Sequence, residues 1–149
     1  MSESSSHQPD ANNPIRITVT DAPGGRRLAS SGSKWEPVMG YSRGVRVGNT
    51  IAITGTVGVN ADGSYSPSME QQARRSLQII VAAVKALGGR PEHIVRTRMF
   101  VTDVKRWEEV AKAHGQVFAE IRPATSILEV AKLIDAAALI EIEADAVVA

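Results

Sequence analysis

The chain has 149 residues, a net charge of +1 and no cysteine. It is long enough for one domain with a substantial core, and its 43% hydrophobic and 22% charged residues are typical of a globular protein. The composition excludes a disulfide framework, thiol catalysis and zinc–thiolate sites, and the low net charge disfavours binding to nucleic acid. Because no apolar run has the length of a membrane span and the polar start has no secretory apolar region, we expect a soluble, cytoplasmic protein without a membrane partner.

The first third of the chain predicts a tail and then short strands. Residues 1–13, MSESSSHQPDANN, are polar and lack apolar periodicity, which predicts a flexible tail ahead of a single domain of residues 14–149. Four strands are predicted next, at residues 15–20, 28–31, 42–47 and 51–57. The stretch DAPGGRR (21–27) is expected to break the chain between the first two strands.

The middle of the chain predicts a helix, a strand and a second helix. After a loop over residues 61–67, Ser66 is expected to cap the first helix with Pro67 at its first position, and Gly88-Gly89 to end it. A strand over residues 93–102 follows, with one face formed by Val95, Thr97, Met99 and Val101. Asp103 is expected to cap the second helix.

Two strands are predicted at the C-terminus, over residues 121–134 and 139–148. Alternation along the second places one set of side chains on one face: Ile140, Ile142, Ala144, Ala146 and Val148. The acids Glu141, Glu143 and Asp145 share the other face. Such alternation is typical of a strand with one solvated face. The alternative interpretation is that Glu141 lies in a cleft between subunits and does chemistry.

The order of elements is strands, helix, strand, helix and strands. This order predicts an α+β fold, a two-layer sandwich with the helices on one face of the sheet. On the other face, Arg96 and Arg98 can pair with the C-terminal acids if the two strands are neighbours. From the residues alone, that charged face fits either the solvent-exposed surface of a monomer or a packed interface between subunits.

We predict no metal site and no cofactor. His7, His93 and His114 are far apart in sequence, and no spacing of His, Asp and Glu resembles a ligand set. The chain also has no G-x-S-x-G nucleophile elbow and no phosphate-binding or dinucleotide-binding glycine pattern.

Three stretches carry a resemblance to a known family. They are GYSRGVRVGNTIAITGTV (40–57), VRTRMFVTDVKRWEEV (95–110), and the C-terminal pair IRPATSILEVAKLI (121–134) and LIEIEADAVV (139–148). In this order and spacing they resemble the Rid family, also called RidA, YjgF or endoribonuclease L-PSP. The resemblance implies a chorismate-mutase-like fold with a mixed sheet, and a homotrimer that binds small molecules in clefts between its subunits.

The resemblance also implies roles for residues of the cleft. Glu141 matches the glutamate that positions or activates water, and Tyr41 matches a tyrosine that lines the cleft. Thr54 matches a hydroxyl-bearing position, and Gly55 matches a glycine that leaves room for the substrate. The family reaction is hydrolysis of a reactive enamine or imine to a keto acid and ammonia, which needs no cofactor because the imine carbon is already electrophilic.

The remaining substrate-binding positions fall on the strand after Pro123: Ala124, Thr125 and Ile127. Thr125 departs from the family pattern, because active members carry an arginine there that grips the substrate carboxylate through paired, charge-assisted hydrogen bonds. Threonine offers one neutral hydroxyl, so the resemblance predicts weak or no activity on 2-iminopropanoate and a gain from Thr125→Arg. Whether Arg43, Arg96, Arg98 or Arg122 supplies another cation is left open by the sequence.

Three functions follow from these observations. The first is a hydrolase (deaminase) of imines, enamines or related small carbonyl compounds, with Glu141 as base. The second is a trimer that binds a small ligand without catalysis. The third is an endoribonuclease or translation inhibitor, which the near-neutral charge and the 4% aromatic content disfavour.

Overall fold

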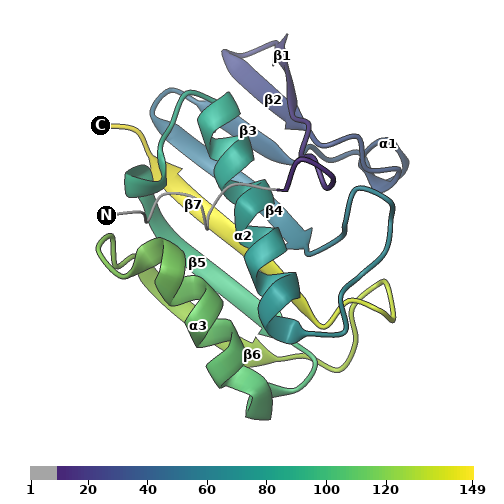
Figure 1. Cartoon of the computed structure of the whole chain (residues 1–149). Helices are drawn as coiled ribbons and strands as arrows, with labels where there is room; N and C mark the ends of the chain where they lie inside the picture. Colours follow the sequence, from purple (N-terminus) through teal and green to yellow (C-terminus); the bar gives the residue numbers. More distant parts are fainter. Residues whose placement is uncertain (1–9) are drawn as a thin grey trace.

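The computed structural model describes residues 10–149, so His7 and most of the predicted tail lie outside the described residues. The described chain forms a mixed α+β fold around one seven-stranded sheet (Figure 1). The strands are β1 (Thr18–Ala22), β2 (Arg26–Ser30), β3 (Gly44–Val47), β4 (Thr50–Val57), β5 (Ile94–Val101), β6 (Ala124–Glu129) and β7 (Ile140–Val147). The helices are α1 (Trp35–Met39), α2 (Met69–Ala86) and α3 (Trp107–Phe118), with short 3-10 turns η1 (Pro91–His93) and η2 (Val104–Arg106).

The strand order in the sheet is β1-β2-β3-β4-β7-β5-β6. All neighbours are antiparallel except β5 and β6, which run parallel. A parallel neighbour needs a crossover connection, and α3 provides it between β5 and β6. The C-terminal strand β7 therefore lies inside the sheet, between β4 and β5, which brings the start of β7 beside the end of β4.

Helices α2 and α3 lie side by side across the sheet (Figure 1). Beneath them, the alternation predicted for β7 is confirmed, because Ile140, Ile142, Ala144 and Ala146 are buried whereas the intervening acids stay partly exposed. Burial of each large aliphatic side chain stabilises the fold by about 1.5–3 kcal/mol. The acids pair as expected with β5: Arg98 Nη1 lies 3.2 Å from Glu143 Oε1 and 3.3 Å from Asp145 Oδ2.

The start of α2 differs from the sequence prediction. Ser68, not Ser66, is the N-cap, and its hydroxyl accepts a hydrogen bond from the Gln71 backbone N–H at 3.2 Å. Pro67 therefore precedes the helix. Ser66 instead uses its carbonyl to accept from the Gln72 side chain at 2.7 Å. The predicted end of the helix is correct, since Gly88 adopts φ +87, a left-handed conformation that favours glycine.

Strand β5 contains an irregularity that shifts its side-chain alternation. The register with β7 slips between Ile94 and Arg96, and as a result Ile94 is buried while Val95 is 48% exposed. The prediction that Val95 shares one face with Thr97, Met99 and Val101 was therefore wrong. From Thr97 onward the predicted face is correct, with Thr97, Met99 and Val101 buried.

Two further differences lie near the N-terminus. The break expected over residues 21–27 is present but shorter: β1 runs to Ala22, β2 begins at Arg26, and Gly24 and Gly25 turn the hairpin between them at φ +79 and +71. Of the residues assigned to the tail, Asn13 is held in the domain. Its side chain donates to Asn60 at 3.0 Å and accepts from the Ala61 N–H at 2.7 Å.

Candidate functional site

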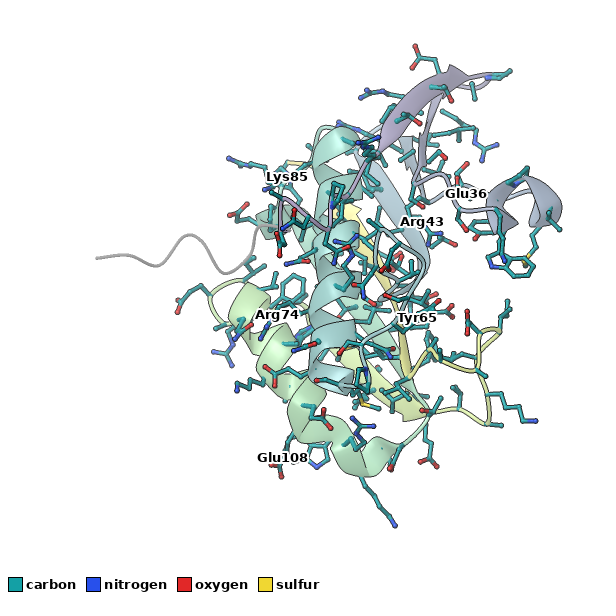
Figure 2. All side chains as sticks on the ribbon, turned by 45° about the vertical axis from the view of Figure 1, so that its right-hand side comes forward. Glu36, Arg43, Tyr65, Arg74, Lys85 and Glu108 are labelled. Carbon is teal, nitrogen blue, oxygen red and sulfur yellow. The ribbon has the colours of Figure 1, made fainter. Side chains whose placement is uncertain are left out.

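A cavity of about 1010 Å³ opens beside the end of β4 and the start of β7. We call it the Glu141 pocket, and the residues that matter for its chemistry are Tyr41, Arg43, Thr54, Gly55, Tyr65 and Glu141. They come from the segment after α1, from β4, from the loop before α2 and from β7. In Figure 2 the labelled Glu36, Arg43 and Tyr65 lie toward α1, whereas Arg74 and Glu108 lie over α2 and α3.

Glu141 is the second residue of β7 and is only partly exposed. Burial raises the pKa of its carboxyl above the ordinary value of 4.5; the positive charge of Arg43 opposes this effect, and Glu143 adds to it. A carboxylate with a raised pKa is a stronger base once it is deprotonated. The position therefore suits proton transfer to and from a bound molecule.

The backbone next to Glu141 is irregular. The pairing of β4 with β7 shifts register between Ile53 and Thr56, so Thr54 and Gly55 have no partner in that register. A Cβ atom at Gly55 would lie 2.8 Å from Cδ and 2.9 Å from Oε2 of Glu141. The room left by the missing side chain of Gly55 is thus occupied by the Glu141 carboxylate itself.

Arg43 reaches the same bulge from the segment just before β3. Its backbone N–H donates to the Ala29 carbonyl at 2.8 Å, and its carbonyl accepts from the Thr54 N–H at 3.1 Å. Its guanidinium Nη1 donates to the Gly55 carbonyl at 2.9 Å and to Thr56 Oγ1 at 3.2 Å. Arg43 is 7% exposed, so the structure places a desolvated cation in the pocket.

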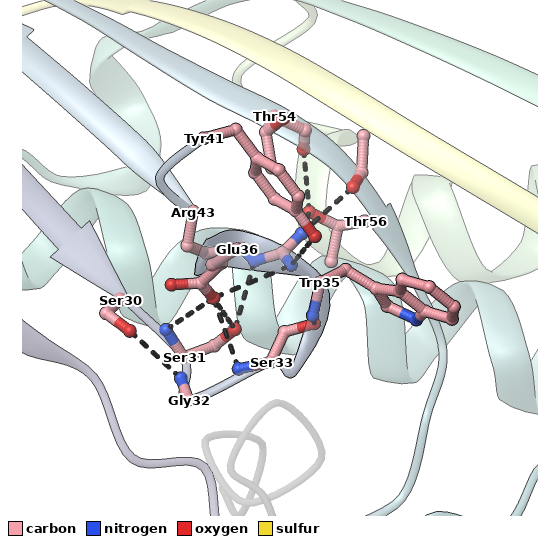
Figure 3. Close-up of polar contacts among 11 residues, drawn as sticks. Ser30, Ser31, Gly32, Ser33, Trp35, Glu36, Tyr41, Arg43, Thr54 and Thr56 are labelled. Carbon is pink, nitrogen blue, oxygen red and sulfur yellow. Dashed lines mark hydrogen bonds and ion pairs between the residues drawn. The ribbon is translucent and has the colours of Figure 1, made fainter. Parts of the chain in front are cut away.

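Behind Arg43 lies a buried acid, Glu36 of α1 (Figure 3). Its Oε2 is 3.9 Å from Arg43 Nη2 and accepts hydrogen bonds from the backbone and hydroxyl of Ser31 at 3.2 and 2.9 Å. Burial alone would raise the pKa of Glu36, but hydrogen bonds from Ser30, Ser31 and Ser33 outweigh it and lower the pKa. Glu36 therefore remains ionised and balances part of the Arg43 charge.

Two tyrosines complete the polar lining. The Tyr41 hydroxyl accepts a long hydrogen bond of 3.5 Å from Arg43 Nη2, and the guanidinium lies 5.7 Å from the Tyr41 ring centroid. Burial raises the pKa of Tyr65, and the negative charges of Asp135 and Glu141 raise it further. Tyr65 is thus held as a neutral phenol that can donate or accept a hydrogen bond.

The residues predicted from the sequence fall into two groups. Tyr41, Thr54, Gly55 and Glu141 line one pocket. The other three, Ala124, Thr125 and Ile127, lie on the edge strand β6 and are not among the described residues that line it.

The side chains of Thr125 and Ile127 also point elsewhere in this chain. Thr125 Oγ1 is 2.6 Å from Thr97 Oγ1, which in turn is 2.9 Å from His114 Nε2 of α3. Ile127 packs against the hydrophobic core. Because Thr125 is two strands and three register positions from Glu141, the two residues are roughly 14 Å apart along the sheet. Within one subunit they do not form a common site.

Sequence reasoning missed two residues of the site and left a third open. Glu36 and Tyr65 lie in segments with no periodic pattern. The fold alone brings Tyr65 to the lining of the pocket and Glu36 to the far side of Arg43. Arg43 was one of four arginines that could have supplied a cation, and the structure selects it. Among residues 10–149, no group of three or more His, Cys, Asp or Glu side chains could hold a metal ion. No helix in this described part is long and apolar enough to cross a membrane.

These features define a polar pocket on a mixed α+β fold, and comparison with known proteins identifies the family. The chain belongs to the family described as Endoribonuclease L-PSP, the Rid (YjgF) family, whose model matches residues 31–148. It is 38% identical over 111 residues to a protein of Escherichia coli named 2-iminobutanoate/2-iminopropanoate deaminase, which covers 72% of this chain and 86% of that protein.

Solved structures of relatives agree with the fold. Rv2704 of Mycobacterium tuberculosis, described as a member of the YjgF/YER057c/UK114 family, is 42% identical with a TM-score of 0.77, covering 83% of this chain and 99% of that one. TdcF of E. coli, solved with bound serine, is 30% identical with a TM-score of 0.69, covering 73% of this chain and 88% of that one. The sequence-based prediction of the family is thus confirmed.

Proposed function

We propose that this protein hydrolyses small imines or enamines, or a related carbonyl compound, with Glu141 as the general base. The observation that carries the proposal is the half-buried Glu141 carboxylate, which lies against Gly55 and faces a pocket of about 1010 Å³. The name of the E. coli relative, an imine deaminase, supports the same class of reaction.

The proposed reaction needs one water molecule and one group that exchanges protons. Water attacks the imine carbon while Glu141 takes its proton, and the C=N double bond becomes a C–N single bond. Glu141 then returns this proton to nitrogen, which gives a carbinolamine. In the second half of the reaction Glu141 takes the hydroxyl proton of the carbinolamine and passes it to nitrogen as the C–N bond breaks, so that ammonia leaves and a carbonyl group remains. The hydroxyl groups of Tyr41 and Tyr65 can hold the water or the carbonyl oxygen during these steps.

We further propose that the working unit is a homotrimer of two-layer subunits with its ligand in clefts between them. The sheet face that carries Arg98, Glu143 and Asp145 is only partly covered in the single chain. Packing of subunits over this face would bring β6 of one copy, with Ala124, Thr125 and Ile127, toward the Glu141 pocket of another. That arrangement would reunite the two groups of predicted residues.

A second candidate function is ligand binding without catalysis. The observation in its favour is Thr125, which stands where active members of the family carry arginine and whose hydroxyl lies within hydrogen-bonding distance of Thr97. The positive charge that binds the substrate carboxylate in active members of the family is therefore missing from β6. The family description also contains the word endoribonuclease, but a net charge of +1 offers little attraction for a polyanion.

Ammonia release from freshly generated 2-iminopropanoate tests the proposal. We expect the wild-type chain to accelerate the release, and Glu141→Gln to lower the rate about 100-fold or more, because an amide cannot accept the proton of water. Glu120→Gln is the matched control, since it removes an exposed carboxylate after α3. A wild-type rate equal to that of buffer alone would leave ligand binding as the better proposal.

A further inference from the structure

Three hydrogen bonds hold the guanidinium of Arg43. They involve Nε and Nη1 and leave Nη2 without a short hydrogen bond. Nε donates to Ser31 Oγ at 3.1 Å, and Nη1 donates to the Gly55 carbonyl and to Thr56 Oγ1 at 2.9 and 3.2 Å. These contacts fix the plane and the direction of the group. They come from Ser31, the residue after β2, and from β4, so the sheet and the residue that follows β2 position the guanidinium.

The contacts of Nη2 are long by comparison. Its distance to the Tyr41 hydroxyl is 3.5 Å, and its distance to Glu36 Oε2 is 3.9 Å. Strong charge-assisted hydrogen bonds are about 2.7–2.9 Å long, so neither contact satisfies a donor fully. A ligand oxygen that approached Nη2 would replace weak contacts with a strong one, in a place where little water competes.

The position of Nη2 relative to the proposed base restricts the ligand. Gly55 contacts both groups: its carbonyl accepts from Arg43, and its Cα adjoins the Glu141 carboxylate. A ligand that reaches both must therefore carry its negative charge close to its reactive carbon. A 2-oxo or 2-imino acid has this arrangement, because its carboxylate is bonded directly to the carbonyl or imine carbon.

We propose that Arg43 is the carboxylate-binding residue of the Glu141 pocket, so that the pocket selects small 2-imino or 2-oxo acids over their uncharged counterparts. Glu36 acts as a positioning residue, since it balances the buried charge and holds the guanidinium from behind. The cation thus comes from the segment before β3, whereas position 125 on β6 carries threonine. The inference rests on the proposed function for the identity of the reactive carbon.

The test compares the binding of pyruvate and pyruvamide, which have similar shapes and differ in charge. Ligand-observed NMR titrations of the full chain at constant ionic strength give both affinities. We expect wild-type protein to bind pyruvate at least about tenfold more tightly, which is the lower range for a hydrogen bond to a charged group. Equal affinities, or no detectable binding of pyruvate, would overturn the role of Arg43.

Variants then test whether the preference for pyruvate depends on Arg43. Arg43→Gln should weaken pyruvate binding about 10- to 100-fold and change pyruvamide binding less than about threefold. Arg27→Gln is the matched control, because it removes the same charge from a side chain of β2 that is 44% exposed and lies outside the pocket. It should keep the preference for pyruvate. If Arg43→Gln also keeps the preference for pyruvate over pyruvamide, the proposal fails. If Arg43→Gln does not fold, the role of Arg43 is judged from Arg43→Lys and from the two wild-type affinities.

The two proposals fail in different ways. Ammonia release by wild-type protein without a preference for the carboxylate would overturn the role of Arg43 and leave the hydrolase in place. A clear, Arg43-dependent preference without ammonia release would overturn the hydrolase and leave an anion-binding pocket. Both measurements use the same full-length chain.

Discussion

The Glu141 carboxylate lies against the Cα of Gly55, so closely that a Cβ at residue 55 would be 2.8 Å from Glu141 Cδ. The carboxylate is the far end of a flexible side chain, which can move aside. Gly55 also has an ordinary backbone conformation for any residue, since it is not among the glycines with positive φ. The contact therefore constrains the site much more than it constrains the fold.

Gly55→Ala should displace the Glu141 carboxylate and lower imine hydrolysis at least about tenfold, since misplacement of a reacting group by about 1 Å is costly. We expect the free energy of unfolding to change by less than about 1 kcal/mol. Gly115→Ala in α3 is the control, because its Cβ would meet no atom within 4 Å. It should keep full activity; an equal loss in both variants would show that the effect is not local.

The raised pKa of Glu141 predicts a pH dependence of stability. Between its ordinary value of 4.5 and the raised value, the folded chain binds more protons than the unfolded chain, so wild-type stability falls as the pH rises through this window. Glu141→Gln lacks this loss. Relative to wild type, the variant should thus become more stable as the pH rises.

Urea unfolding at pH 4 and pH 8, at one protein concentration, measures this difference. The ammonia-release rate of the wild type should rise over the same window, because only the deprotonated carboxylate acts as a base. A wild type that gains stability relative to Glu141→Gln with rising pH would contradict the proposed environment of the carboxyl group.

The buried hydrogen bonds of Arg75 in α2 indicate that replacing this residue lowers the stability of the fold strongly. It is 6% exposed, burial lowers its pKa, and its three nitrogens donate to the carbonyls of Val59, Asn13 and Pro14. Arg75→Gln leaves at least one of these carbonyls without a donor, so we expect a loss of about 2–3 kcal/mol. The adjacent Arg74 forms a partly exposed ion pair with Glu70, and Arg74→Gln should cost less than about 1 kcal/mol. Thermal unfolding compares the two; similar losses would mean that the buried contacts of Arg75 add little.

The proposed homotrimer predicts the mass in solution. Sedimentation equilibrium at micromolar concentration should give three times the 15.9 kDa mass of the chain. The reason is the charged sheet face, together with the separation of β6 from the Glu141 pocket within one subunit. A single species of 15.9 kDa would remove the model of a cleft between subunits.

Thr125→Arg should raise the rate on 2-iminopropanoate by supplying a second guanidinium from a neighbouring subunit. The change also removes the contact with Thr97, at a cost of about 1 kcal/mol. Thr125→Gln is the control for this loss, because it adds no charge. The gain should be larger when Arg43 is also replaced by Gln, and it should vanish with Glu141→Gln. Equal effects of Arg and Gln at position 125 would contradict a role for the added charge.

Much of the fold could be predicted from local patterns. Alternation identified both faces of β7, and helical spacing identified α2. The short helix α1 could not be found, since it has five residues with Pro37 among them and no repeated apolar spacing. The slip in β5 at Val95 was equally hidden, because a bulge depends on the partner strand and not on the residues of the strand itself.

The site was predictable only where a residue resembles a family position. Glu141, Tyr41, Thr54 and Gly55 were predicted in this way as candidate site residues, and they line one pocket. The resemblance does not reveal which side of β6 faces a ligand, and in the single chain Ile127 packs against the core. Nor can it reveal the pairing of Glu36 with Arg43, which depends on how α1 folds back onto the sheet.

The bulge in β4 limits how this pocket can change during evolution. Gly55 has no partner in the register with β7, and its carbonyl accepts a hydrogen bond from Arg43. A lineage that replaced Arg43 with an apolar residue would lose the positive charge proposed to bind the ligand. It would also leave the Gly55 carbonyl oxygen without its hydrogen-bond donor. Glutamine or lysine could keep that hydrogen bond while altering specificity. We therefore expect new specificities to arise first through those two substitutions, each of which leaves the backbone supported.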